Sequence, residues 1–389
     1  MRMGITLILA LLVIAPTLSI SGAQEATEAP LGCQLSFDGT LANESVGFQT
    51  SLGPRIPGSA ASSALRESIK SNLTGWHITE STHHAEGMVL TNLYATWNKG
   101  AGSTVMFAAH YDSRAHGDKD WNESRHEEPI DGANDGASGV AVLIELARHI
   151  PSMNLSHEVT LFFTDGEDQG DYMSHSGWIL GAKAWAENLT TEEADSIESF
   201  ILVDMIGDSD LTLRKTHPGN SSLWDRTEEK ILFLDNVCNL GSSDYFDFQG
   251  ADGIYDDHVP AHELGIPAID IIDTRYGENA SYLGGHWHTH NDTADKVSAE
   301  SLEKIGFILE SGLLTGTWSD IRVNDKIENE EIISDPELVD EIEEIEEIEE
   351  IEEIEESQND GEMVIGILLI ICILFMWYRI IFADNRGEG

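Results

Sequence analysis

Short apolar runs alternate with amphipathic segments through the middle of the chain. Four runs rich in β-branched and aromatic residues predict buried strands: Thr104–Ala109, Val159–Phe163, Phe200–Val203 and Ala268–Ile272. Gly136–Ile150 is apolar at helical spacing, and Ile179–Asn188 predicts a further helix. Strands that alternate with helices form a mostly parallel sheet with both faces covered. We therefore expect one α/β domain of three layers, with a mostly parallel, mixed central sheet between helices.

The first residues of the chain are typical of a secretory signal peptide. Arg2 precedes the apolar run Ile5–Ile14, and small residues follow up to Ala23. We expect cleavage near Ala23, so that the signal peptide is residues 1–23. A retained N-terminal anchor is the alternative, although the apolar run is short for a membrane span.

The C-terminal end has the pattern of a membrane anchor. Met363–Phe382 is a twenty-residue apolar stretch with one charge, Arg379, and is long enough to cross a bilayer as a transmembrane helix. It follows residues 327–362, an acidic low-complexity segment that repeats Ile-Glu-Glu and predicts a solvated linker. Basic residues flank the far side of the stretch, which predicts a cytoplasmic tail at residues 383–389. We expect a single-pass protein of the cell membrane whose catalytic domain, residues 24–326, is extracellular.

The net charge and the sequons agree with an exported protein. The chain has 389 residues and a formal net charge of −49, and because such a field repels nucleic acid, we exclude a nucleic-acid partner. The three cysteines are too few for a disulfide framework, and spacing alone leaves open whether Cys33 pairs with Cys238. Eight N-x-S/T sequons predict a glycoprotein, with acceptors at Asn43, Asn72, Asn122, Asn154, Asn188, Asn220, Asn279 and Asn291.

Polar clusters follow the predicted strands along the chain. In a parallel sheet, ligands bind beyond the carboxyl ends of the strands, where we expect these clusters to meet. Each cluster alone is explained by helix capping or by a turn. Together, their carboxylates and imidazoles are the donors of zinc sites, including paired sites that share a bridging carboxylate. The clusters are His110 with Asp112, Asp131–Gly136, Asp165–Asp168, Asp204 and His286–Asp292.

The order of these motifs is more specific than any one of them. Along the chain they run His110-x-Asp112, Asp135-Gly136, Gly166-Glu167-Asp168, Asp204 and His288-Thr289. This order resembles that of metallopeptidase family twenty-eight, which contains di-zinc aminopeptidases and glutaminyl cyclases. The similarity extends over residues 48–314, nearly the whole predicted domain. The resemblance implies a zinc-dependent enzyme with its metal site at the carboxyl ends of the strands.

The resemblance also implies roles for single side chains. Glu167 is implied as the general base, because a carboxylate that is not bound to metal takes up a proton and passes it to the leaving amine. Asp112 would orient the imidazole of His110, which lies two positions before it, and a role only in local hydrogen bonding is the alternative. Five residues are implied as zinc ligands: His110 and Asp204 on one ion, Asp168 and His288 on the other, and Asp135 as the bridge between them.

Two reactions are consistent with the resemblance. All five ligand positions are filled, which favours a di-zinc aminopeptidase that removes the N-terminal residue of peptides with metal-activated water. The alternative is a glutaminyl-peptide cyclotransferase, which forms N-terminal pyroglutamate and in that branch needs one zinc, at the positions of Asp135, Asp168 and His288. Cyclases resemble the chain in four segments: Phe162–Glu167, Ile201–Gly207, Asp256–Pro260 and Trp287–Thr289.

Two departures from the cyclase pattern support the first hypothesis. Asp168 stands where a second glutamate is usual in both branches, and Gln169–Met173 replaces the aromatic wall expected soon after it in cyclases. A third hypothesis is a membrane receptor or scaffold without catalysis. It is disfavoured, because every ligand position holds a usable side chain and Glu167 is retained. The predicted partners are therefore peptide N-termini and, through the C-terminal helix, the membrane.

Four more residues are candidates for contacting the substrate or supporting a ligand: Asp257, His258, Tyr282 and Trp287. Tyr282 or His258 would help to stabilise an oxyanion. Trp287, beside a proposed ligand, would pack in the core or form a substrate wall.

Overall fold

The structure, a computed structural model, describes residues 29–322 of the chain. The predicted signal peptide, acidic linker, membrane helix and tail all lie outside these residues. Within residues 29–322, no helix has the length and apolar character that a membrane span requires. The described residues make up nearly all of the predicted catalytic domain.

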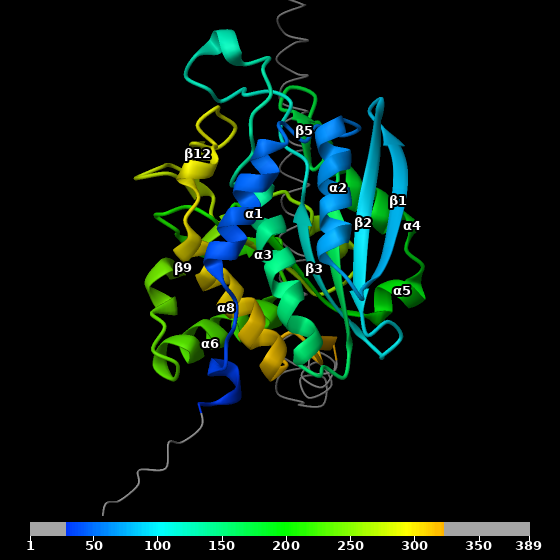
Figure 1. The fold of residues 1–389 in the computed structure, drawn as a ribbon, viewed down its shortest axis with the longest axis vertical. Helices are drawn as coiled ribbons and strands as arrows, with labels where there is room; N and C mark the ends of the chain where they lie inside the picture. The colour runs from blue at the N-terminus through cyan, green and yellow to red at the C-terminus, as the bar shows by residue number, and fades with distance from the viewer. Residues whose placement is uncertain (1–28, 323–389) are drawn as a thin grey trace, which may run out of the picture.

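A six-stranded sheet forms the middle layer of the molecule (Figure 1). Its strands, in spatial order, are β1 (His77–Ala85), β2 (Met88–Trp97), β4 (Glu158–Thr164), β3 (Thr104–His110), β7 (Ile197–Asp204) and β10 (Ala268–Ile272). The pairs β1–β2 and β2–β4 are antiparallel, whereas β4, β3, β7 and β10 are parallel neighbours. The expected mixed sheet is confirmed, and the four strands predicted from apolar runs form its parallel part.

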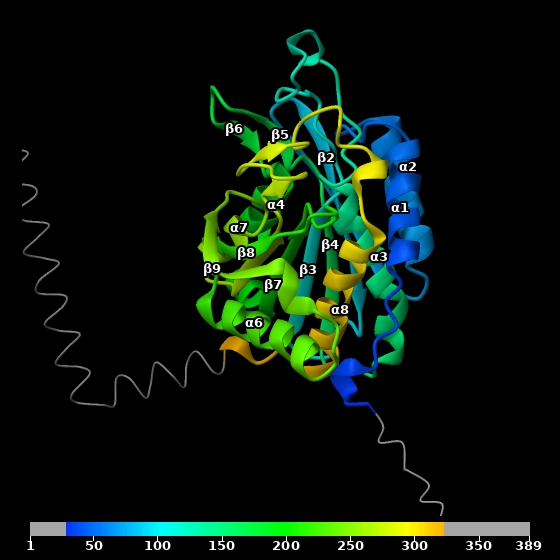
Figure 2. The same cartoon turned by 90° about the vertical axis from the view of Figure 1, so that its left-hand side faces the viewer.

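Helices cover both faces of this sheet (Figure 2). On one side α3 contacts β3 and β7, while α1 and α8 pack on α3. On the other side α4 contacts β2, and α7 contacts β10. The helices are α1 (Gly39–Ser51), α2 (Ala60–Asn72), α3 (Ala137–His149), α4 (Leu180–Asn188), α5 (Thr191–Ser196), α6 (Ser221–Asn236), α7 (Val259–Glu263) and α8 (Ala299–Thr315).

Both faces of the parallel strands are buried in apolar cores. In β3, Val105 and Phe107 belong to the core under α1, α3 and α8, whereas Met106 and Ala108 belong to the core under α4. Successive side chains of a strand point to opposite faces, so a strand covered on both sides is apolar at every position. This explains why continuous apolar runs, and not alternating ones, predict these strands.

Shorter elements surround the carboxyl ends of the parallel strands. Three further strand pairs are β5 (Asp168–Asp171) with β6 (Ser176–Trp178), β8 (Leu213–His217) with β9 (Phe246–Gly253), and β11 (Arg275–Tyr276) with β12 (Gly284–Gly285). Short 3₁₀ helices lie at Leu31–Cys33, Glu123–Arg125, Ile150–Ser152, Ser242–Tyr245 and Ala294–Lys296. The β5–β6 pair follows β4 directly along the chain, and this connection carries part of the candidate site.

The predicted helices have close counterparts, but one hairpin is not predicted. Gly136–Ile150 corresponds to α3 and Ile179–Asn188 to α4, each within a residue or two of the observed bounds. The antiparallel strands β1 and β2 have no counterpart among the predictions. Every residue of β1 is at least partly exposed, so neither a continuous nor an alternating apolar pattern marks it in the sequence.

A disulfide joins Cys33 to Cys238 across 205 positions of sequence. It links the segment before α1 to the segment just after α6 and shows that these two cysteines pair, which the spacing left open. A native disulfide restricts the unfolded chain, so Cys33→Ser is expected to lower the free energy of unfolding by about 2–4 kcal/mol. Chemical denaturation with each variant measures this change. Cys372→Ser removes the cysteine outside the bridge and is the matched control; equal midpoints for both variants would contradict a stabilising role.

Candidate metal centre

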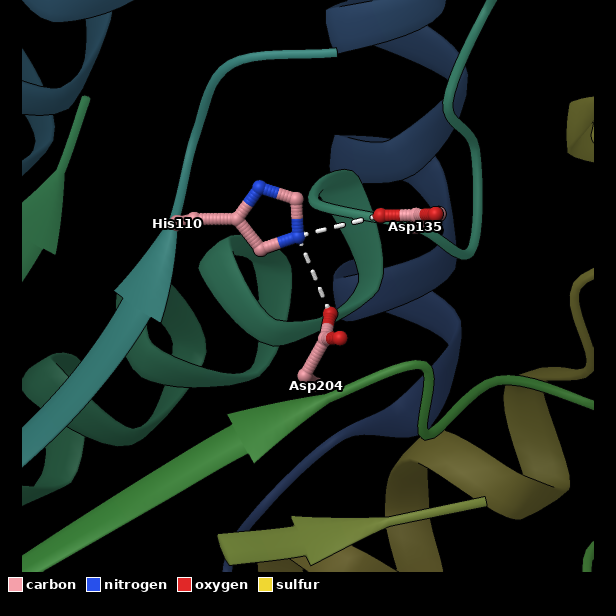
Figure 3. Close-up of side chains that lie close together, drawn as sticks. All are labelled: His110, Asp135 and Asp204. Carbon is pink, nitrogen blue, oxygen red and sulfur yellow. Dashed lines mark hydrogen bonds and ion pairs between the residues drawn. The ribbon is translucent and has the colours of Figure 1, made fainter. Parts of the chain in front are cut away.

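His110, Asp135 and Asp204 meet at the carboxyl edge of the sheet (Figure 3). His110 is the last residue of β3, Asp204 is the last residue of β7, and Asp135 lies just before α3. Because β3 and β7 are parallel neighbours, their carboxyl ends lie side by side. His110 Nε2 is 3.1 Å from Asp135 Oδ1 and 3.1 Å from Asp204 Oδ1.

A second group of three residues shares Asp135 with the first. It adds Asp168, the first residue of β5, and His288 from the loop before α8. His288 Nε2 is 3.1 Å from Asp168 Oδ1 and 3.6 Å from Asp135 Oδ2. The two carboxylate oxygens of Asp135 thus face different imidazoles, as a bridging ligand requires.

The two triplets fit zinc ions. In each triplet one ligand atom per residue lies within 4.8 Å of the others, and all five side chains are buried. Carboxylates buried this closely repel one another unless a cation compensates their charge. Asp168 Oδ2 is buried and has no hydrogen-bond partner among residues 29–322. Mixed imidazole and carboxylate donors, with an unpaired acceptor oxygen among them, are the donor set of a zinc site.

Asp135 is held by the chain on either side of it. Its N–H and that of Asn134 donate to the carboxylate of Asp292, at 3.2 and 2.7 Å. Gly136 follows with a φ of 96°, and a Cβ at this position would lie 2.5 Å from the main-chain oxygen of Asp112. The glycine of the Asp-Gly motif is therefore required by the backbone conformation and by the close approach of another loop.

Asp112 contacts both His110 and the loop that carries Glu167. Asp112 Oδ1 lies 3.4 Å from His110 Nδ1. The Asp112 carboxylate also accepts the N–H groups of Glu167 and Asp168, at 3.1 and 3.2 Å. Nδ1 of His110 makes no hydrogen bond among residues 29–322. The Asp112 carboxylate faces Nδ1 while Nε2 faces the other residues of the triplet, which is the side of the ring from which an orienting role for Asp112 would act.

Glu167 lies beside the second triplet without belonging to either. It lines the site cavity and is 8% exposed. Burial and the neighbouring carboxylate of Asp256 raise the pKa of Glu167 well above its ordinary value. A carboxyl group with a raised pKa takes up a proton readily, as a general base or proton carrier must.

The site opens into a cavity of about 700 Å³ with one aromatic wall. Tyr172, Trp178 and Trp287 form this wall next to His288. The ring of Trp178 is nearly parallel to that of His288, with an interplanar angle of 8°. The ring centroids of Trp287 and His288 are 3.7 Å apart. An aliphatic wall comes from Met205, Ile254, Ile272 and Leu283.

The sequence pattern led us to expect no aromatic wall after Asp168, but the cavity has one. In the β5–β6 pair, Asp168 lies opposite Trp178, so the hairpin places the indole ring of Trp178 beside a proposed metal ligand. Tyr172 comes from the segment Gln169–Met173 itself, where it begins the hairpin turn. The indole also covers Gly170, where a Cβ would lie 2.0 Å from the ring. The sequence does not reveal this wall, because only the hairpin register brings Trp178 beside Asp168.

The remaining candidates divide between the cavity and the core. Tyr282 and Trp287 line the cavity, whereas Asp257 and His258 are fully buried and do not. His258 Nε2 donates to the main-chain oxygen of Pro218 at 2.9 Å, and burial lowers the pKa of His258 to about 4. His258 therefore has its Nε2 proton engaged and lies outside the cavity lining, a position that does not support the expected role in stabilising an oxyanion.

Asp256 lines the cavity in place of its neighbour Asp257. Both lie in the turn before α7, where the motif in the sequence does not determine which carboxylate turns toward the site. Tyr282 Oη donates to the main-chain oxygen of Gly253 at 2.5 Å, so its proton is already engaged. Tyr282 is therefore better suited to shaping the cavity than to stabilising an oxyanion.

The family of the chain follows from its sequence as well as from this site. Residues 92–311, more than half of the chain, match the profile described as Peptidase family M28. The chain belongs to peptidase family M28. The matched range includes both triplets and Glu167.

Relatives of both enzyme types resemble this chain. Glutaminyl-peptide cyclotransferase of Gloydius blomhoffii is 26% identical over 292 residues, which cover 66% of this chain and 76% of its own. Porphyromonas gingivalis glutaminyl cyclase matches with a TM-score of 0.63 and 31% identity, covering 72% of this chain and 98% of that chain. A leucine aminopeptidase precursor from Bacteroides thetaiotaomicron matches with a TM-score of 0.63 and 26% identity, over 72% and 98% of the two chains. Members of the M28 family are zinc-dependent aminopeptidases and glutaminyl cyclases, so this protein is an enzyme of that zinc-dependent class.

Proposed function

We propose that this member of the M28 family is a glutaminyl-peptide cyclotransferase, which converts the N-terminal glutamine of a peptide to pyroglutamate. The aromatic wall beside the second triplet carries this proposal, because the sequence pattern of cyclases calls for such a wall. Trp178 and Trp287 both stack on the imidazole of His288. Planar rings at this position suit a substrate whose reacting group is a planar amide.

The reaction balances without water. The α-amine of glutamine attacks the carbon of its own side-chain amide, the ring closes, and ammonia leaves. Asp135, Asp168 and His288 would hold the zinc ion, which would supply Lewis-acid chemistry at this end of the cavity. Glu167 takes the proton that the amine gives up and returns it to the departing nitrogen. Its place in the cavity beside Asp168, outside both triplets, leaves its carboxylate available for this transfer.

Aminopeptidase activity is the second candidate, because both triplets are complete. His110 and Asp204 would provide a second metal position that shares Asp135, and hydrolysis assisted by two metal ions would use both positions. Glu167 would then take a proton from water and pass it to the leaving amine. Two zinc ions per chain would favour the peptidase, and one would favour the cyclase.

The proposed setting is the outer face of a cell membrane. The Cys33–Cys238 disulfide supports it, since disulfides persist in oxidising compartments. The eight sequons agree with export. The signal peptide, glycosylation and membrane helix remain predictions from the sequence, and peptide N-termini are the proposed substrates.

Removing the indole of Trp178 is expected to weaken substrate binding more than turnover. Trp178→Ala should raise KM about 2- to 10-fold, as the loss of one stacking contact does, with a smaller change in kcat. Steady-state kinetics with Gln-Ala-Ala measures both constants. Trp121→Ala removes an indole that is 85% exposed and should change neither. An unchanged KM for Trp178→Ala would contradict a substrate-contacting wall.

A pair of peptides separates the two candidate reactions. Zinc-loaded protein is expected to release ammonia from Gln-Ala-Ala, measured in a coupled glutamate dehydrogenase assay, and to leave Leu-Ala-Ala intact. N-acetyl-Leu-Ala-Ala serves as the blocked control. Release of leucine from the free peptide but not from the acetylated one would support the aminopeptidase and contradict the first proposal.

A further inference from the structure

The two proposed histidine ligands have matching surroundings. Each turns Nε2 toward the carboxylates of its own triplet. Each also turns Nδ1 toward a further carboxylate: Asp112 Oδ1 lies 3.4 Å from His110 Nδ1, and Asp118 Oδ1 lies 3.4 Å from His288 Nδ1. Both of these outer carboxylates belong to the segment that follows β3. One short stretch of chain therefore contacts both histidines.

Arg114 fixes the position of Asp118. Its guanidinium donates to both oxygens of that carboxylate, with Nε 2.9 Å from Oδ1 and Nη2 2.6 Å from Oδ2. Nη1 donates to Asp168 Oδ1 at 2.9 Å. The guanidinium also lies 4.8 Å from the ring centroid of Trp178. Arg114 is 2% exposed and the side chain of Asp118 is 26% exposed, so the guanidinium is internal and the carboxylate that it holds is partly buried.

We infer that Asp118 is a positioning residue for His288. A carboxylate only accepts hydrogen bonds, so its contact with Nδ1 favours the tautomer that carries the proton on Nδ1. The lone pair of Nε2 then faces Asp135 and Asp168, as metal binding requires. Through its two hydrogen bonds, Arg114 holds the Asp118 carboxylate in the position where Oδ1 faces Nδ1 of His288. The inference rests on the proposed metal centre and holds for cyclisation and for hydrolysis alike.

Tyr172 is the competing partner of His288. Its Oη lies 3.1 Å from Nδ1. A phenol that donated to Nδ1 would leave the imidazole proton on Nε2, where it would block a metal ion. With the proton on Nδ1, Tyr172 Oη and Asp118 are both acceptors for it. Tyr172→Phe is therefore expected to keep the tautomer and the zinc affinity of the wild type.

Zinc affinity and the tautomer of His288 test the role of Asp118. In the full-length Asp118→Ala protein, affinity for one zinc ion is expected to fall about 10- to 100-fold, measured by competition with a chromophoric chelator. Asp118→Asn keeps one acceptor oxygen and should lose less. Nitrogen NMR of the metal-free, isotope-labelled protein is expected to show Nδ1–H at His288 in the wild type and a mixture of tautomers in Asp118→Ala.

Asp120→Ala is the matched control on the same loop. Asp120 bonds to His290 Nδ1 at 2.8 Å, and neither residue belongs to a triplet. The zinc affinity of the Asp120→Ala protein should stay within about 2-fold of that of the wild type. Wild-type affinity and an unchanged tautomer in Asp118→Ala would overturn the inference, and so would equal losses in the two variants, which would indicate a loosened loop. Neither readout depends on the reaction, so a protein that fails to cyclise glutamine can still confirm or refute the role of Asp118.

Discussion

Glu167→Gln is expected to lower kcat for a glutaminyl peptide by about 10²- to 10⁴-fold while leaving the zinc content unchanged. The amide has nearly the shape of the carboxylate, but it cannot take up a proton at neutral pH. Glu167 belongs to neither triplet, so its replacement removes no proposed ligand. Steady-state kinetics, with zinc measured by atomic absorption on the same samples, gives both quantities.

Glu187→Gln is the matched control for this experiment. Glu187 is an exposed carboxylate on α4 and does not line the cavity. It should retain the kcat and the zinc content of the wild type. If Glu167→Gln turned over at the wild-type rate, Glu167 could not be the proton carrier in either candidate reaction. If it lost zinc, the carboxylate would be acting as a ligand instead.

Asp135→Ala is expected to abolish activity by removing the side chain that both triplets share. The loss should be about 10³-fold or more, since several kcal/mol of metal-dependent stabilisation disappear. Zinc content should fall at the same time. The metal-free variant should be at least as stable as the metal-free wild type, because one of several crowded carboxylates is gone. Thermal unfolding in a chelator separates this effect from misfolding.

Asp131→Ala provides the comparison for Asp135→Ala. Asp131 lies on the same loop, and its side chain is exposed and outside the cavity. It should keep full activity and full zinc content. Retention of zinc and activity in Asp135→Ala would rule out a bridging carboxylate and with it the shared metal centre.

Three residues of the two triplets, His110, Asp204 and Asp168, were accessible from the sequence because each stands at or shortly after the end of a predicted strand. Asp135 and His288 instead lie in loops that lead towards α3 and α8. His110 and Asp204 end β3 and β7, and parallel pairing alone determines that these ends are neighbours. The apolar runs identified those strands, since strands buried on both faces carry no polar interruptions. Glu167 and Asp168 follow β4 in the same way. Their place at one edge of the sheet thus required no knowledge of loop conformation.

Residues carried by loops were less accessible, because their positions depend on pairings that no local pattern encodes. Trp178 reaches the cavity through the register of a hairpin whose two strands have no apolar alternation. Asp256 and Asp257 are adjacent in one turn, yet Asp256 lines the cavity and Asp257 is buried in the core. Asp118 acts on a histidine far away in the sequence, and only the fold shows the contact.

The product that zinc-loaded protein forms from Gln-Ala-Ala tests the proposed activity most directly. Mass spectrometry is expected to show pyroglutamyl-Ala-Ala, which is the substrate less one ammonia, with both peptide bonds intact. The Glu167→Gln protein should leave the peptide unchanged under the same conditions. Free glutamine together with Ala-Ala would contradict cyclisation and identify the protein as an aminopeptidase.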